Sequence, residues 1–263
     1  MVKFCSLFSG SSGNCIFVSD EKTKILIDAG LSGVRIIEAL NSIGEDPSEI
    51  SAILITHEHS DHTKGVGILS RKFNIPIYAN SGTWEGMRRE LGKIKPEFAK
   101  VFSTDNDFMV GDIGVRPFQI PHDAAEPVGY SFYIGSKKVT TATDIGHMNN
   151  TILGELKKSD ILLLESNHDI EMLKVGPYPY YLKQRILSDH GHLCNEMAGK
   201  VISYMAEQGT RYFVLGHLSR ENNFPELAYQ TTLNALVEKG IEVGKEVSLE
   251  VAARDHAGTV ITL

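Results

Sequence analysis

The segment Thr56-His57-Glu58-His59-Ser60-Asp61-His62 holds four potential metal ligands within six residues, directly after a hydrophobic run at 52–55. Imidazole nitrogens and carboxylate oxygens are ligands that suit zinc and similar divalent ions. A tight turn at the end of a strand can direct alternate side chains toward two adjacent centres. A polar loop that only faces solvent would not explain why so many histidines occur together. The segment therefore predicts a metal site.

Three further candidate ligands follow β-rich runs and precede loops in the same way: His122, Asp144 and His217. Any one of them alone could be an ordinary surface residue, or a core residue with satisfied hydrogen bonds. Their repeated placement at strand ends, together with the histidine cluster, favours one shared site.

The elements that would position these residues are short strands that alternate with helices along the whole chain. A helix is expected after the N-cap candidate Ser32, because the apolar residues that follow have helical spacing. Strands are predicted at 4–7, 15–19, 24–27, 52–56, 75–79, 107–110, 114–120, 161–164 and 212–215, with a hairpin at 129–143 and two closing strands. Two sheets covered by outer helices are the simplest architecture. No linker divides the chain, so we expect one domain over 1–263.

The composition narrows the class of protein further. With 263 residues and 42% hydrophobic side chains, the chain can bury a full-sized core, which excludes a disordered or fibrous protein. The net charge of -7 provides no global field for polyanions, so any nucleic-acid contact must come from a local basic patch. Three sparse cysteines suit a reducing compartment. With neither a signal peptide nor a membrane-spanning run recognisable, we expect a cytoplasmic protein without membrane contacts.

The order H-x-H-x-D-H, His, Asp, His, preceded by Ile25-Leu-Ile-Asp28-Ala-Gly30, resembles the metallo-β-lactamase-fold hydrolases over essentially the whole chain. The resemblance implies an α/β fold, an αββα sandwich of two mixed sheets flanked by helices, with two divalent ions per chain between the sheets. Zinc, manganese and iron all accept such ligands, with zinc or manganese as the first candidates. The residues that this family pattern implies are His57, His59 and His122 on one metal, Asp61, His62 and His217 on the other, Asp144 across both, and Asp28 as a supporting aspartate.

Several shorter motifs are similar to the YycJ/WalJ branch of this superfamily, whose members are described as nucleases acting on DNA. These motifs are Ser9-Gly-Ser-Ser-Gly-Asn14-Cys15, Glu165-Ser-Asn-His168-Asp169, the Tyr178-Pro179 turn followed by Lys183-Gln-Arg185, and Gly191-His192-Leu-Cys-Asn195. The resemblance implies that Asp61, His192 and Glu165 are catalytic. A leaving oxygen needs a proton, which a histidine supported by a carboxylate can supply. Alternatively, His192 is a surface or helix-capping residue before a helix at 193–207, and Glu165 an ordinary surface or ion-paired carboxylate.

Candidate substrate contacts are less specific. A glycine-rich turn can offer backbone N–H groups and hydroxyls to a phosphate, although an ordinary tight hairpin explains it equally well. Basic side chains gather at 88–100 behind Trp84 and again at Lys183, Arg185 and Arg220, where they could hold a strand backbone or simply face solvent. Only 26 residues separate Glu165 from His192, so the substrate groove is expected either to be shallow or to be built by 171–185 as a small flap. The candidate substrate-binding residues are Ser11, Ser12, Asn14, His168, Tyr178 and Arg220.

These observations predict a dinuclear metal-dependent phosphodiesterase, an exonuclease acting on DNA. An RNA phosphodiesterase would use the same groups. A small-molecule hydrolase of the same fold, such as a glyoxalase II-like thioesterase or a lactonase, would not need His192, because a thiolate leaves without a proton. A scaffold without catalysis would have no use for seven candidate ligands.

Overall fold

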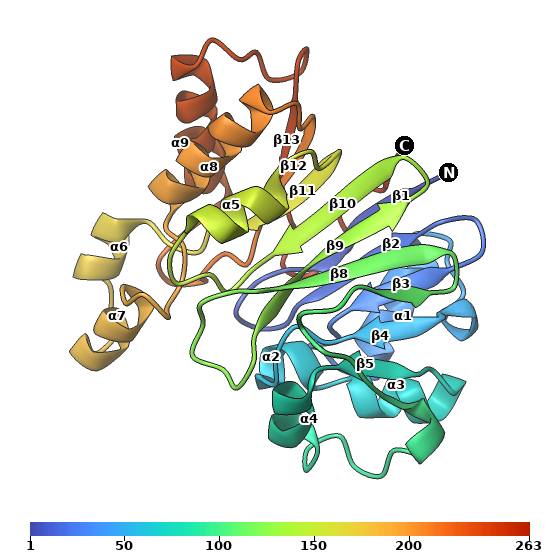
Figure 1. Ribbon diagram of the computed structural model, residues 1–263. Coiled ribbons are helices and arrows are strands. Elements are labelled where there is room, and N and C mark those ends of the chain that lie inside the picture. Colours follow the sequence, from blue (N-terminus) through green and yellow to red (C-terminus); the bar gives the residue numbers. More distant parts are fainter.

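A computed structural model describes all 263 residues and contains two seven-stranded sheets that pack face to face, with helices outside them (Figure 1). The first sheet has the order β14 (Ile261–Thr262), β1 (Lys3–Phe8), β2 (Cys15–Ser19), β3 (Lys24–Ile27), β4 (Ala52–Leu54), β5 (Ile77–Ala79) and β6 (Ala99–Val101). The second has the order β13 (Ser248–Val251), β12 (Tyr212–Gly216), β11 (Ile161–Glu165), β10 (Lys137–Ala142), β9 (Val128–Ile134), β8 (Ile113–Gln119) and β7 (Phe108–Val110).

Both sheets are mixed. Strands β1 to β3 are antiparallel and β3 to β6 parallel, while β7 to β10 are antiparallel and β10 to β13 parallel. The α/β sandwich of two mixed sheets is thus confirmed. None of the helices has the length and apolar character that a bilayer crossing requires.

Alternation along the strands explains why two sheets can share one core. Ile25 and Ile27 of β3 join the cluster between the sheets, whereas Leu26 joins the cluster on the outer face. In β11, Leu163 faces inward and Leu162 outward. A strand buried on both faces reads as a continuous hydrophobic run, as these two do. Each sheet therefore needs helices on its outer side.

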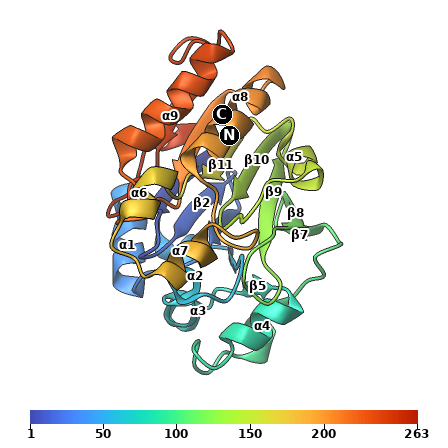
Figure 2. The same cartoon turned by 90° about the vertical axis from the view of Figure 1, so that its left-hand side faces the viewer.

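The helices supply that cover. The first sheet packs against α1 (Gly33–Ser42) and α3 (Val66–Phe73), and the second against α5 (Asn150–Leu156), α8 (Asn195–Glu207) and α9 (Pro225–Glu238). Ser32 caps α1 by accepting from the Arg35 N–H, as predicted. Shorter helices are α2 (Ser60–Thr63), α4 (Ser81–Met87), α6 (Ile170–Val175) and α7 (Tyr180–Ile186), with 3-10 turns at Pro47–Glu49 and Pro96–Phe98. Figure 2 shows α6 and α7 beside each other on one flank.

Some predicted boundaries were wrong. Strand β4 ends at Leu54 rather than at residue 56, and α8 begins at Asn195 rather than at 193. The basic segment at 88–100 follows α4, which ends at Met87, and contains a 3-10 turn and the start of strand β6, which was not predicted. Because β6 is short and largely exposed, no apolar alternation marks it in the sequence.

Strand direction brings the candidate residues to one edge of the sandwich. Asp28 and the histidine segment follow the parallel strands β3 and β4, and Asp144, Glu165 and His217 lie at or just beyond the carboxyl ends of β10, β11 and β12. Carboxyl ends of parallel strands meet at the same edge of a sheet.

Candidate metal centre

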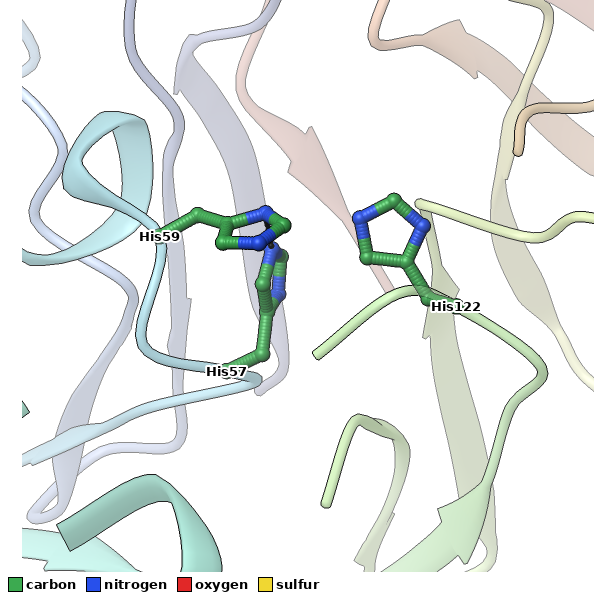
Figure 3. Close-up of side chains that lie close together, drawn as sticks. All are labelled: His57, His59 and His122. Atoms are coloured by element: carbon green, nitrogen blue, oxygen red, sulfur yellow. Dashed lines mark hydrogen bonds between the residues drawn. The ribbon is translucent and has the colours of Figure 1, made fainter. Parts of the chain in front are cut away.

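Three histidines form the first group of possible ligands. His57 and His59 lie on the loop between β4 and α2, and His122 approaches them from the loop after β8 (Figure 3). The Nε2 atom of His57 is 3.1 Å from Nδ1 of His59. The His122 ring centre is 5.1 Å from each of the other two ring centres. One nitrogen from each ring lies within 4.8 Å of the others, which would allow all three to reach one ion.

A second group lies directly beside the first. Oδ2 of Asp61 is 3.5 Å from Nε2 of His62 and 3.7 Å from Nε2 of His217. Asp144 stands between the two groups, with Oδ2 3.5 Å from Nε2 of His62 and Oδ1 3.8 Å from Nε2 of His122. The seven side chains singled out from the sequence therefore converge on one region.

These donors suit divalent metal ions. The Nε2 atoms of His122 and His217 and the Oδ2 atom of Asp144 are buried and have no hydrogen-bond partner in the protein. Leaving a buried polar atom unpaired costs roughly 1–3 kcal/mol. A bound cation would remove that cost for all three atoms, because each would then act as a ligand.

The electrostatics of the centre also call for positive charge. Burial opposes protonation of His62, but the carboxylates of Asp28, Asp61 and Asp144 outweigh it and raise the pKa of His62 well above its usual range. Burial likewise opposes protonation of His217, yet Asp144, Asp61 and Glu165 raise its pKa to about 10. Without a metal, the histidines thus carry the positive charge that the buried carboxylates require. His57 differs, because burial and the neighbouring His62 and His122 lower its pKa well below the usual range.

Asp28 orients the second group from behind. Its Oδ2 atom is 2.7 Å from Nδ1 of His62, which leaves Nε2 of that ring directed into the centre. Thr56 donates its N–H to Oδ1 at 2.9 Å and its hydroxyl to Oδ2 at 2.9 Å. Carboxylates that hold a ligating imidazole in this way fix its tautomer and raise its basicity. The supporting position expected for Asp28 is thus compatible with its contacts.

Close backbone packing keeps Asp61 beside this support. A Cβ atom on Gly30 would lie 1.7 Å from the Asp61 carbonyl oxygen, so only glycine fits there. The Asp61 carbonyl accepts the Asn14 N–H at 2.8 Å.

Glu165 links the centre to a further histidine. Its Oε1 atom lies 2.8 Å from Nδ1 of His192 and 2.8 Å from Nδ1 of His217, while Oε2 accepts the N–H groups of Ile145 and Leu193. Burial opposes ionisation of Glu165, but the neighbouring His192 and His217 outweigh it and lower the pKa of Glu165. This carboxyl group is therefore ionised. Of the alternatives for Glu165, a surface carboxylate is wrong, because Glu165 is fully buried, whereas an ion-paired carboxylate agrees with its contacts to His192 and His217. The alternative that His192 caps α8 is also wrong, since Cys194 occupies that position.

The predicted glycine-rich turn divides into two parts. Asn14 is buried, and its Nδ2 atom is 3.1 Å from Nε2 of His62. Ser11 and Ser12 are exposed, and Ser12 lines a surface pocket. Sequence reasoning missed Ser9, whose hydroxyl accepts the His217 N–H at 2.7 Å. That serine lies in the same motif, which was the only available signal.

The other predicted substrate contacts lie around the centre. His168 is 1% exposed, and burial lowers its pKa to about 4. With His192 it lines an otherwise largely apolar cavity of about 280 Å³. Tyr178 is half-buried between α6 and α7, whereas Tyr180 and Tyr181 on α7 are 76% and 75% exposed.

The basic groups found in the sequence differ in their availability. Arg185 pairs with Asp123, next to His122, and Lys183 donates to the Lys174 carbonyl. Arg220 is exposed and has no ion pair. The basic residues near Trp84 surround a separate surface pocket of about 910 Å³ on α4 and the segment after it.

The amino-acid sequence of this chain is similar to one family model and to several known proteins. A family model described as the Beta-lactamase superfamily domain matches residues 23–218. The chain is 43% identical to "Exodeoxyribonuclease YycJ" of Bacillus anthracis over 92% of each chain. It is 41% identical to "Exodeoxyribonuclease WalJ" of Streptococcus pneumoniae over 97% of this chain and 96% of the relative.

Among solved structures, the metallo-β-lactamase fold protein YhfI from Bacillus subtilis superposes with a TM-score of 0.70 at 14% identity, over 98% of this chain and all of the other. Zn²⁺-bound PqqB from Methylobacterium extorquens superposes with a TM-score of 0.72 at 18% identity, over 98% and 100%. At such low identity these two likenesses concern the fold alone.

Proposed function

Because the chain belongs to the metallo-β-lactamase superfamily and, within it, to the family of the YycJ and WalJ exodeoxyribonucleases, we propose that it is a metal-dependent hydrolase that removes nucleotides from the ends of DNA. The structural observation that carries this proposal is the contact between Glu165 and His192 at the border of the candidate metal centre. A proton donor is required when an alkoxide leaves a phosphodiester, and less so for a thiolate.

We assign the metal ligands as follows, on the basis of the distances and unpaired atoms described above. One ion would be held by His57, His59 and His122, and a second by Asp61, His62 and His217, with Asp144 shared between them. Zinc and manganese are the first candidates, with iron as a third. When bound, such ions supply Lewis-acid activation of water and neutralise charge on the phosphate.

The proton for the leaving oxygen would come from His192. Glu165 engages Nδ1 of His192, so Nε2 is the nitrogen available to a substrate, and it makes no hydrogen bond within the protein. The ionised Glu165 carboxylate stabilises the imidazolium form that must donate. Asp61 is partly exposed at the edge of the centre, and the Asn14 amide lies 3.1 Å from Nε2 of His62, so both would be near a phosphate bound at the centre.

The cavity beside His192 supports a role in holding the leaving nucleotide. Its apolar lining includes Met148, Leu187 and Met197, and its buried polar member, His168, has an unpaired Nε2 atom. A flat base with apolar faces and a polar edge matches such a lining. The exposed aromatic rings on α7 would offer stacking surfaces to the strand outside this cavity.

Cleavage of end-labelled DNA by the purified, metal-loaded protein tests the proposal. We expect labelled mononucleotides to be the first product, before any fragment of intermediate length. A chelator should abolish the reaction until zinc or manganese is restored. Metal analysis should give two ions per chain. Equal or faster cleavage of a matching RNA would assign RNA as the substrate. Activity confined to thioesters or lactones would refute the nuclease assignment.

A further inference from the structure

A strongly basic pocket on the surface includes residues that follow candidate metal ligands closely along the chain. It has a volume of about 490 Å³, and its lining contains four cationic side chains but only one acidic residue. The cationic residues are Arg35, Lys64, Arg220 and Arg254, and the acidic one is Asp255. This concentration of basic side chains is unusual for a chain with a net charge of -7, in which acidic residues outnumber basic ones.

The positive charge of this pocket is largely uncompensated. Lys64, Arg220 and Arg254 form no ion pair, and Arg35 approaches Asp255 Oδ1 only to 3.9 Å. Arg254 donates through Nη2 to the Leu218 carbonyl, but its buried Nη1 atom has no partner. Four like charges repel one another at short range, so their gathering in one pocket indicates an anionic ligand.

Local contacts hold the arginines in place before any ligand arrives. The Arg35 guanidinium lies over the Phe8 ring at 5.0 Å and donates to the Asp255 carbonyl at 3.0 Å. Gly10 permits the close approach of the glycine-rich turn to Arg254, since a Cβ atom there would lie 2.9 Å from Nη1. The Gly10 φ of +152° also favours glycine. The pocket is therefore preorganised.

The chain connects this pocket directly to the metal centre. Lys64 follows Asp61 by three residues at the end of α2, and Arg220 follows His217 by three residues after β12. Ser12, on the rim of the pocket, belongs to the turn whose Asn14 lies 3.1 Å from His62. A strand whose scissile phosphate lay at the centre would thus carry a neighbouring phosphate toward the pocket.

We propose that Arg35, Lys64, Arg220 and Arg254 bind a phosphate group of the DNA strand next to the phosphodiester that is cut. The inference rests on the proposed function and adds to it a binding subsite outside the candidate metal ligands. Arginine forks and a lysine ammonium are the side chains best suited to phosphate oxygens. The phosphate is either the terminal one of the strand or an internal phosphodiester, which share the same chemistry.

A second basic pocket provides the internal contrast. It lies at the start of β10, whereas Asp144 follows the end of that strand, so the two sites are at opposite ends. Three of its five cations are already engaged: Arg116 pairs with Glu155, Lys137 pairs with Asp160, and Lys138 donates to the Lys157 carbonyl. Lys158 on its rim is exposed and has a φ of 60°, so Lys158→Gly removes one charge without strain.

Binding of a fluorescent oligonucleotide to the metal-loaded full chain tests the pocket. A His192→Ala background slows cleavage during the measurement. Arg220→Ala and Lys64→Ala remove exposed side chains, so both should fold normally, which thermal unfolding checks. We expect each to weaken binding roughly tenfold and to reduce the slope of log affinity against log salt by about 1. Arg220→Lys should restore most of the affinity, and Lys158→Gly should leave both quantities unchanged.

Oligonucleotides with a 5′-phosphate and a 5′-hydroxyl distinguish the two phosphates. A loss confined to the phosphorylated end assigns the pocket to the terminal group, and an equal loss on both assigns it to an internal phosphodiester. Wild-type affinity and salt slope in Arg220→Ala and Lys64→Ala would overturn the proposal. Binding does not require turnover, so a wild-type chain that binds DNA through this pocket but cuts none would refute only the proposed function.

Discussion

Oε1 of Glu165 lies 2.8 Å from Nδ1 of His192, and Glu165 is fully buried. The same oxygen is equally close to Nδ1 of His217, a candidate metal ligand. One carboxylate therefore orients both a candidate ligand and the candidate proton donor. Metal binding and proton transfer in this protein should consequently respond together to a change at Glu165.

We predict that Glu165→Gln lowers kcat on DNA by about 10- to 100-fold and weakens metal binding by a similar factor. The amide has nearly the same shape, but it cannot accept from both imidazoles and both backbone N–H groups. Steady-state kinetics and a metal-chelator competition measure the two effects. Glu155→Gln, at the opposite end of the sheet, is the matched control and should change neither. Loss of only one of the two properties would contradict the shared role.

We predict that His192→Ala lowers kcat on DNA by about 10²- to 10⁴-fold, with a smaller loss on a p-nitrophenyl phosphodiester. The nitrophenolate needs no proton to leave, so the difference between substrates isolates the acid role. His190→Ala is the control, because His190 is exposed and its ring makes no hydrogen bond. Equal losses on the two substrates would exclude His192 as the proton donor.

We predict that Asp28→Asn weakens metal binding by about 10- to 100-fold while the protein stays folded. Asparagine tolerates the left-handed backbone at this position, but it removes the charge that holds Nδ1 of His62. Isothermal titration with zinc compares the variant with Asp112→Asn, an exposed aspartate remote from the centre. An unchanged zinc affinity would show that Asp28 has no part in the metal site.

We predict that Tyr178→Ala, and separately Tyr181→Ala, raises KM for DNA severalfold with little effect on kcat. Aromatic stacking contributes roughly 1–3 kcal/mol per base, and α7 exposes its rings beside the site. Fluorescence anisotropy with single- and double-stranded DNA supplies the direct measurement. Unchanged affinity for both forms would remove the α6–α7 segment from the substrate path.

We predict that His168 makes the folded protein sensitive to acid. Its folded pKa of about 4 lies below the usual 6.5, so the unfolded chain binds the proton first as the pH falls. The stability associated with neutral His168 is therefore present above pH 6.5 and lost progressively toward pH 4. When the pH is lowered from 7.5 to 5.0, the free energy of unfolding of the metal-free wild type, measured in urea, should fall by about 2 kcal/mol more than that of His168→Gln. An equal fall in the free energy of unfolding of the two proteins would contradict this role of His168.

The convergence of the candidate metal ligands could be predicted from the sequence because they follow strands. His57, His59, Asp61 and His62 lie within six residues, and the other candidate ligands follow hydrophobic runs that are easily recognised. Parallel strands then bring those ends together by a general rule of sheet geometry.

The basic pocket escaped sequence reasoning for the opposite reason. Arg35, Lys64 and Arg254 come from a helix, a helix end and a loop that are far apart in the chain. Single charged residues at such places usually serve solubility. Arg220 was considered with Lys183 and Arg185, but Arg185 is engaged by Asp123, and only packing reveals which charges remain free.

Three of the site residues have a left-handed backbone: Asp28 (φ 60°), Asp144 (φ 60°) and His217 (φ 55°). Side chains other than Asp, Asn, His and Gly rarely adopt this conformation. The substitutions that these positions tolerate are consequently limited to very few amino acids, even in a relative that no longer catalyses hydrolysis. A library that randomises any one of these three positions should return fewer folded members than one that randomises His59 or Asp61, whose backbones are ordinary.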